Sequence, residues 1–477
     1  MNDKKELALC DQAGIHILEE GTSTWQTIVD GDMTSLTMKT MYMVGFVSAA
    51  NSNYYILYIS QNGYSFMKYS YDDSANAVPS NELNIYSIKD NPTLRQAAAV
   101  FRQTHPDIKV NFNIIITDEE YLEADQAIID DYVRALNTEL LAGNGPDILV
   151  LDDLPIDSYI AKGHLLDISD IIQPMIDKDQ LYTDIMSNYN TNDKIYYLPT
   201  RIIPNLICTR SSDADKLSRM EDLSEYLEKA RDRTVFGKMT YEDFINEFAP
   251  YIINKILNED RTVSNNKLTF QLDLLKTIGD SIGLVDQYIG DEKYINSEIN
   301  IANEIELAFS HPMGFSHAMI PIGMVDLVKG NYIVFENSFI PVCELAVNQA
   351  SDRKELSKEF VSLVISEEVQ KEDFFDGFPV NKKAMELCIQ KETGDYGAAV
   401  GIRREDGSEE IHYFEPMNKD QKKELADKYA GISNRIVKNE PLLAFIKDEL
   451  REFLNDSLSI EDTALRIIDR INIYLSE

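Results

Sequence analysis

Cysteine and tryptophan are scarce in this chain of 477 residues, which has four cysteines and a single tryptophan, Trp25. Cys10, Cys208, Cys343 and Cys388 are widely separated and form no Cys-x-x-Cys pair. This spacing argues against a disulfide framework and against a zinc site. We expect four isolated, buried thiols.

Basic side chains are also few, with 45 Lys and Arg against 81 Asp and Glu and a formal net charge of −36. Nucleic acids and anionic membranes both require a basic face, so neither is expected as a partner. No run approaches the roughly 18 apolar residues of a membrane span. The 44% apolar content supplies core for two or three domains.

A signal segment is missing as well, since no apolar core follows the opening Met-Asn-Asp-Lys-Lys-Glu. Residues 7–10 only faintly resemble a lipidation box, because Leu9 is bulky where a small residue must precede the cysteine. We therefore expect a truncated start, with any signal segment outside this sequence.

The motifs of common enzyme classes are absent from the sequence, including GxGxxG, GxxxxGK and the EF-hand loop. His311 and His317 are six residues apart, which fits no zinc-binding helix. The stretch Gly314-Phe-Ser-His317 lacks the glycine that a nucleophile elbow needs two residues after the serine. Pairs of carboxylates are expected by chance among 81 acidic residues, so a glycosidase pair stays open. The sequence nevertheless favours a protein that is not an enzyme.

The most informative stretch is Ala142–Leu154. Gly143 and Pro146 predict the end of a helix, and the apolar run 148–151 predicts a buried parallel strand. Asp152 and Asp153 would then lie at the carboxyl end of that strand, where open α/β sheets hold their ligands. The alternative is an ordinary surface loop.

Strands and helices alternate from residue 83 to this stretch. We expect a strand over 83–88, a helix capped by Asn91 and ended by His105-Pro106, a strand over 108–112, and a helix reaching Ala142. This alternation predicts a parallel sheet with crossover helices. Farther on, the patterns predict helices over 298–309 and 353–366 and strands over 319–347.

Residues 1–80 have a different, β-rich character. The run 54–59 and the run 64–71 flank Gln61-Asn-Gly63, the strongest kind of short hairpin signal, and 15–18 with 25–29 predict a second strand pair. These strands resemble one or two blades of a β-propeller. They form either a small sheet packed on the main body or, as we slightly favour, part of a larger N-terminal domain.

Residues 83–477 resemble the bacterial extracellular solute-binding proteins of ABC importers, family 1, best known for sugars. Five stretches in the family's order carry the resemblance: 94–110, 145–152, Tyr196-Tyr-Leu-Pro199, Gly377-Phe-Pro-Val-Asn381 and 459–464.

This resemblance implies an α/β, two-lobed periplasmic-binding-protein-like fold with crossing hinge strands, preceded by the small antiparallel β segment. Lobe 1 would be 83–198 with 338–372, and lobe 2 would be 199–337 with 373–477. Hinge closure would clamp the ligand between the lobes. The residues implied as ligand-binding are Lys89, Asp90, Asn91, Asp152, Asp153, Tyr197, Arg201, Tyr332, Phe335 and Asn337.

The implied function is to bind a polar small molecule, with carbohydrate as the favoured class, and deliver it to ABC permease subunits. Neither metal nor cofactor is expected. The full-length form would be an extracellular, cell-surface-associated lipoprotein and a monomer. Sugar binders usually place tryptophans in the cleft, whereas Trp25 lies in the N-terminal segment. The alternative function is a cell-surface receptor or sensor that feeds no transporter.

Overall fold

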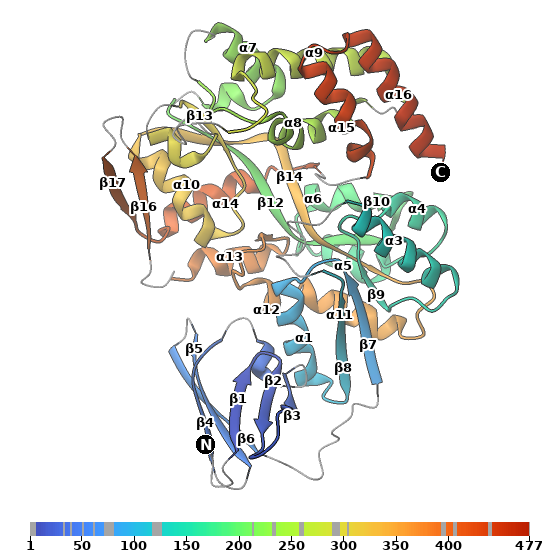
Figure 1. The fold of residues 1–477 in the computed structure, drawn as a ribbon, viewed down its shortest axis with the longest axis vertical. Coiled ribbons are helices and arrows are strands. Elements are labelled where there is room, and N and C mark those ends of the chain that lie inside the picture. The colour runs from blue at the N-terminus through green and yellow to red at the C-terminus, as the bar shows by residue number, and fades with distance from the viewer. Residues whose placement is uncertain are drawn as a thin grey trace.

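The computed structural model describes residues 6–31, 34–38, 41–49, 52–60, 63–70, 81–116, 126–211, 214–230, 235–256, 262–288, 296–302, 305–392, 397–403, 408–436 and 441–476. Two small sheets at the N-terminus lie at one end of a larger α/β body, which runs from β7 (Asn81–Ser87) to α16 (Ile460–Ser476) (Figure 1). In the described parts of the chain, no helix combines the length and apolar character that a membrane span requires.

The N-terminal sheets have three antiparallel strands each. They are β1 (Leu7–Asp11), β2 (Gly14–Leu18) and β3 (Gln26–Asp30), and then β4 (Tyr42–Ala49), β5 (Asn53–Ser60) and β6 (Gly63–Ser70). Buried side chains such as Ile15 and Ile56 give the two sheets a common small core. Both predicted strand pairs are therefore confirmed, although turn residues 61 and 62 lie outside the described part of the chain.

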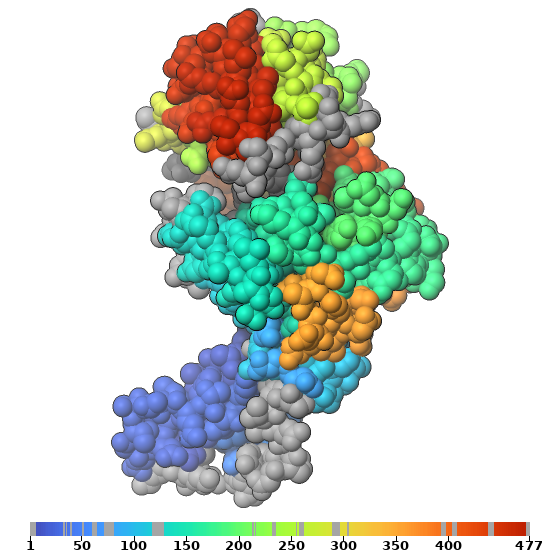
Figure 2. Space-filling model, turned by 90° about the vertical axis from the view of Figure 1, so that its right-hand side faces the viewer, coloured from blue at the N-terminus to red at the C-terminus, as the bar shows by residue number. Residues whose placement is uncertain are grey.

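Polar contacts hold this N-terminal pair of sheets against the body. Arg102 of α1 (Pro92–Thr104) donates to the carbonyl oxygen of Thr34 at 2.5 Å and to the Thr37 hydroxyl at 3.0 Å. Lys109 of β8 (Ile108–Ile114) pairs with Asp30 at 2.7 Å. The N-terminal sheets are thus attached to α1 and β8, and Figure 2 shows them projecting from that end of the body.

An eight-stranded sheet runs through the body in the order β13-β12-β14-β9-β7-β8, with β15 (Phe378–Pro379) paired to β12 and β18 (Asn434–Arg435) paired to β14. Strands β7, β8 and β9 (Ile148–Val150) are parallel, as the alternation of strands and helices predicts. The long strands β12 (Tyr197–Thr209) and β14 (Asn331–Val347) are antiparallel, and β13 (Leu307–Ser310) forms one edge.

Helices form two groups at opposite ends of β12 and β14 (Figure 1). The group around β7, β8 and β9 comprises α1, α3 (Gln126–Leu141), α4 (Ile156–Ala161), α5 (Ser169–Asp177), α6 (Thr183–Met186), α11 (Lys354–Val364) and α12 (Glu367–Gln370). The group at the far end comprises α7 (Met220–Lys229), α8 (Tyr241–Ile256), α9 (Asn265–Ile282), α15 (Pro441–Leu454) and α16. Each group encloses its own hydrophobic core.

A further set of elements lies beside the long strands (Figure 1). It contains α10 (Phe315–Leu327), α13 (Lys382–Gln390), α14 (Lys419–Tyr429) and the hairpin of β16 (Ala398–Arg403) and β17 (Glu409–Phe414). Short elements complete the described chain: η2 (Ser35–Thr37), η3 (Ser187–Tyr189), β10 (Asn190–Thr191), β11 (Lys194–Ile195), η4 (Ala214–Leu217) and η6 (Glu298–Ala302).

Two predicted elements are wrong. For the predicted helix over 298–309, the described residues 298–302 form the short 3-10 helix η6, and the fully buried segment 307–310 joins the sheet as β13. Within 319–347, predicted as strands, residues 331–347 form β14 as expected, whereas residues 319–327 belong to α10, although Pro321 lies inside this helix. Packing on several sides overrides the weak helix propensity of this segment. The prediction of four unpaired, buried thiols is confirmed.

Candidate functional site

The long strands β12 and β14 run between the two groups of helices, and the short β18, on the chain from α14 to α15, pairs with β14; we call these three the crossing segments. The pairing of β12 with β14 shifts register between Pro204 and Leu206. Opposite this shift, Glu336 and Asn337 have positive φ angles of 54° and 47°, a backbone region that side chains rarely adopt. The crossing therefore has a local irregularity in both long strands.

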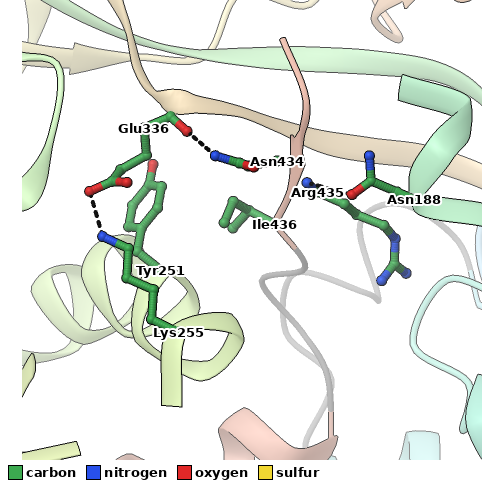
Figure 3. Close-up of a pocket in the computed structure, with 7 residues that line it drawn as sticks. All are labelled: Asn188, Tyr251, Lys255, Glu336, Asn434, Arg435 and Ile436. Atoms are coloured by element: carbon green, nitrogen blue, oxygen red, sulfur yellow. Dashed lines mark hydrogen bonds and ion pairs between the residues drawn. The ribbon is translucent and has the colours of Figure 1, made fainter. Parts of the chain in front are cut away.

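A pocket of about 490 Å³ opens at this irregularity. Figure 3 shows its lining: Tyr251 and Lys255 from α8, Glu336 from β14, Asn188 from η3, and the segment Asn434, Arg435 and Ile436. Helix α8 of the far group, the turn η3 that follows α6, and two of the crossing segments thus contribute to one cavity. Its size is within the usual range for small-molecule sites.

One wall of the pocket is organised by Glu336. Its carboxylate accepts hydrogen bonds from Lys255 Nζ at 2.7 Å and from the backbone N–H of Met220 at 2.8 Å. Its carbonyl oxygen accepts a hydrogen bond from the Asn434 side chain at 2.6 Å. This wall presents an ion pair and an amide, both of which suit hydroxyl-rich ligands.

The opposite wall is organised by Arg435. Its Nε and Nη2 donate to the two carboxylate oxygens of Glu344 at 2.9 and 2.7 Å, a bidentate pair. Its guanidinium also lies 5.8 Å from the ring centroids of both Tyr189 and Tyr197. Burial opposes the charge of Arg435, but Glu344 more than offsets this and raises the pKa of the guanidinium well above its ordinary value.

Asn188 ties this wall to the chain that approaches the crossing. Its side-chain amide donates to the carbonyl oxygen of Ser433 at 2.7 Å, and its oxygen accepts from the backbone N–H of Arg435 at 3.4 Å. One side chain thus holds two successive points, Ser433 and Arg435, of the segment that leads into β18.

Tyr251 is fully buried at the back of the pocket, and burial raises the pKa of its phenol well above the ordinary value. Its hydroxyl has no hydrogen-bond partner in the described structure. Its ring packs edge-on against Phe335, with 5.2 Å between centroids. The pocket thus offers hydrogen-bonding groups rather than an exposed aromatic face.

A second hollow of about 610 Å³ lies where α13 ends and α14 begins. The buried Lys422 ammonium lines it and donates to the carbonyl oxygens of Cys388 and Lys391 at 3.2 and 2.8 Å. These bonds satisfy the C-terminal end of α13. Because this hollow lies away from the crossing, we take the pocket of Figure 3 as the candidate site.

The predicted residues after β7 have structural contacts. Asn91 caps α1 by accepting from the backbone N–H of Leu94 at 3.0 Å. Asp90 pairs with Arg95 at 2.8 Å, and the carbonyl oxygen of Lys89 accepts from Ser87 at 2.6 Å. None of the three is among the residues that line the described pocket.

The two predicted aspartates after β9 also lie outside the described pocket lining. Asp152 is half-buried and accepts from the backbone N–H groups of Cys343 and Glu344 at 2.9 and 2.8 Å. Burial, followed by the nearby Glu344 charge, raises the pKa of Asp152 to about 6. Asp153 has a φ of 64°, as expected for an aspartate in a tight turn.

The two residues predicted at the first crossover have different surroundings. Tyr197 packs against Arg435 and so supports the pocket from behind. Arg201 is buried in a separate network, where it pairs with Asp376 at 3.1 Å and donates to Thr93 at 2.6 Å.

Of the three residues predicted at the return crossover, Tyr332 is buried with Lys428 Nζ 4.8 Å from its ring centroid. Phe335 is a core residue behind Tyr251. Asn337 accepts from the backbone N–H of Ser433 at 2.9 Å through its carbonyl oxygen, and so holds the β18 segment in place.

Sequence reasoning missed five polar residues of the pocket: Asn188, Lys255, Glu336, Asn434 and Arg435. Glu336 is the neighbour of the predicted Asn337, so the prediction pointed to the correct part of the chain for this residue but not to the residue itself. The other four lie on a helix, a turn and a short strand without any motif, and only the fold brings them together.

Residues 87–255 match the family of bacterial extracellular solute-binding proteins. No match to a curated protein is found. The predicted resemblance to these solute-binding proteins is thus confirmed over that segment. The family is one of binding proteins, in agreement with the prediction that the chain is not an enzyme.

Solved structures share the solute-binding fold. The sugar-binding protein MalE from Xanthomonas citri has a TM-score of 0.55 at 11% identity, with 83% of this chain and 97% of that chain covered. An extracellular solute-binding protein family 1 from Alicyclobacillus acidocaldarius has a TM-score of 0.52 at 11% identity, with coverages of 84% and 100%. The predicted two-lobed α/β fold is therefore confirmed.

Proposed function

We propose that this protein binds a polar small molecule, with carbohydrate as the favoured class, between its two lobes and delivers it to an ABC importer. The observation that carries the proposal is the pocket at the crossing, which is lined by α8 of the far group, by η3 after α6, and by two crossing segments. The matched family and the fold shared with a sugar-binding protein support the same function.

The chemistry of the lining supports a ligand rich in hydroxyls. Lys255 and Arg435 are each paired with a carboxylate, so the pocket offers charged donors and acceptors without a large net charge. Such pairs can donate hydrogen bonds to ligand hydroxyls through the cation and accept hydrogen bonds from them through the carboxylate. The lobes are assigned as 83–198 with 338–372 and 199–337 with 373–477, so the pocket would close by motion at the crossing.

The proposed assignment extends to finer points. We take the protein as an extracellular, surface-anchored lipoprotein in its full-length form that acts as a monomer with permease subunits. Of the predicted ligand residues, we retain Tyr197 and Asn337 as supports of the pocket, and we add Lys255, Glu336 and Arg435 as ligand contacts.

A thermal-shift screen of purified protein against mono- and oligosaccharides, polyols and peptides tests this function. A ligand at about 1,000 times its Kd stabilises the folded state by about 4 kcal/mol, which raises Tm by several degrees. A shift with one glycan class is expected. A response to peptides alone, or to nothing in the panel, would contradict the carbohydrate assignment and favour the receptor alternative.

Variants of the pocket connect such a shift to the site. Lys255→Met removes the ammonium group that pairs with Glu336. We expect at least about a tenfold loss of ligand affinity, which corresponds to about 1.4 kcal/mol of binding free energy. Lys358→Met is a matched control. Lys358 lies on α11, outside the pocket lining, and its Nζ pairs with the Asp170 carboxylate at a similar 2.8 Å. Equal losses in both variants would argue against the pocket as the binding site.

The second candidate function is a receptor or sensor that feeds no transporter. It is favoured by the N-terminal sheets, which attach to α1 and β8 and leave several apolar side chains exposed, including Tyr42, Tyr64 and Phe66. In that case a partner would bind the N-terminal sheets rather than both lobes.

A further inference from the structure

Asp152 lies directly behind the Arg435 wall of the pocket. It follows β9, and the sheet continues beyond that strand because the backbone N–H of Leu151 donates to the carbonyl oxygen of Glu344 at 2.8 Å. Both oxygens of Asp152 are then occupied by the N–H groups of Cys343 and Glu344, at 2.9 and 2.8 Å. One half-buried carboxylate therefore holds two successive peptide groups of β14.

The backbone that Asp152 holds is irregular. Cys343 has a φ of 53°, which is unfavourable for a side chain of this kind, and it needs surrounding contacts to persist. Two N–H groups bound to one carboxylate supply such contacts. Without them, we expect the backbone around Cys343 to relax toward an ordinary extended strand.

The next residue, Glu344, transmits this backbone position to the pocket. Its side chain is buried, with 3% exposed, and its two oxygens hold Nε and Nη2 of Arg435. A bidentate pair is sensitive to direction, so a change in the Glu344 backbone must change the position of the guanidinium. The contacts thus run without a break from Asp152 to the pocket wall.

We propose that Asp152 is a positioning residue of the ligand site, whose protonation state sets the geometry in which Glu344 holds Arg435. This proposal rests on the proposed function and deepens it, since it makes the pocket wall responsive to pH. The sequence predicted that Asp152 contacts the ligand, whereas in this proposal it acts through Glu344 on Arg435.

The charged groups that face Asp152 come from three segments: Glu344 on β14, Lys89 after β7, and its own neighbour Asp153. Protonation replaces one acceptor oxygen by an O–H group, so one of the two N–H groups of β14 loses its partner. It also removes the like charge beside Glu344. Both changes act on the residue that holds Arg435.

The test follows the Arg435 Nε–Hε signal in ligand-free, 15N-arginine-labelled full-length protein, with Arg435→Lys used to assign the signal. Between about pH 5 and about pH 8, we expect the signal to move with a midpoint near 6, where Asp152 titrates. In Asp152→Asn the signal is expected to stay fixed across this range.

Asp147→Asn is the matched control. Asp147 is buried at the other end of β9 and accepts from the backbone N–H of Asn84 at 2.9 Å, but its contacts do not lead to Arg435. Its variant should keep the wild-type titration. A constant wild-type signal, a titration that survives in Asp152→Asn, or one that disappears in Asp147→Asn would each overturn the proposal.

The wild-type titration alone can overturn the proposal if Asp152→Asn does not fold. Because no ligand is present, these results are independent of the carbohydrate screen. A fixed Arg435 signal with a positive screen would remove the role of Asp152 and leave the proposed function standing.

Discussion

Two arginines of this protein, the buried Arg201 and the half-buried Arg435, join chain segments that are far apart in sequence. Arg435 connects the third crossing segment to β14 through Glu344. Arg201 connects β12 to the loop around Asp376 and also donates to the carbonyl oxygens of Gly377 and Glu372 at 3.2 and 2.7 Å. One arginine is part of a pocket wall, and the other is part of the framework behind it.

Loss of the framework arginine should reduce stability strongly. Arg201→Met leaves Asp376 as a buried, uncompensated carboxylate, and we expect a loss of about 3–5 kcal/mol in the free energy of unfolding. Arg466→Met is the control, because Arg466 and its partner Glu452 are both about half exposed, and such pairs contribute at most about 1 kcal/mol. Urea unfolding of both variants measures the difference, and equal losses would contradict the structural role of Arg201.

Asp152 should make stability depend on pH in an unusual direction. Its pKa rises from 3.8 to about 6 on folding, so between these values the folded state holds a proton that the unfolded chain has released. Its contribution is therefore complete at low pH and is lost as pH rises through this window. The free energy of unfolding should change by about 3 kcal/mol across this window, since each pKa unit corresponds to about 1.4 kcal/mol.

The comparison that isolates this effect is wild type against Asp152→Asn. The stability advantage of wild type should be larger at about pH 4 than at about pH 7. An advantage that stays constant with pH would show that Asp152 does not titrate in this range.

Single residues were the hardest level to predict from sequence. The predicted Arg201 and Asp152 are polar and close to strand ends, but their side chains bind backbone groups of other segments instead of lining the pocket. Arg435 has no motif around it, and its role depends on the pairing of β18 with β14 across about a hundred residues. Local patterns cannot encode such long-range contacts.

At the scale of secondary structure, the turn before β15 depends on a glycine. Gly377 has a φ of 118°, and a Cβ atom there would lie 2.9 Å from the carbonyl oxygen of Ile202 and 3.0 Å from Arg201 Cβ. A side chain at this position meets both an unfavourable backbone conformation and backbone atoms of β12.

Gly377→Ala should therefore cost about 2 kcal/mol or more of stability, through strain at a special φ/ψ. Gly431→Ala serves as the control, since its nearest non-adjacent atom would be 3.9 Å away and its φ is not positive. We expect Gly431→Ala to be neutral or slightly stabilising. Thermal unfolding that shows similar Tm values for the two variants would contradict the requirement for glycine at position 377.

Elements with strong local signals were predicted well. The Asn91 cap and Pro92 start of α1 were identified because capping depends on neighbouring residues alone. Strand β13 was mistaken for helix because its pattern reflects complete burial rather than alternation, and a short apolar run is ambiguous between the two structures. The order of strands in the sheet was not predicted, since pairing depends on distant segments.

At the scale of the whole molecule, the N-terminal sheets should be separable from ligand binding. They attach through Arg102 and Lys109 to α1 and β8, at the end of the body away from the crossing (Figure 1). Deletion of residues 1–80 should leave the Kd of a ligand from the screen within about twofold, measured by calorimetry. A larger loss of affinity would mean that these sheets take part in binding.

Three strands lying side by side form the joint between the lobes, with β14 between β12 and β18. A narrow ribbon of this kind bends across its face at lower cost than it bends or shears in its own plane. The left-handed pair Glu336 and Asn337 is the irregularity at which we expect the ribbon to bend. For the hinge motion that we propose, in-plane sliding of one lobe past the other would then be the costly movement, and different ligands would close the lobes mainly by bending this ribbon.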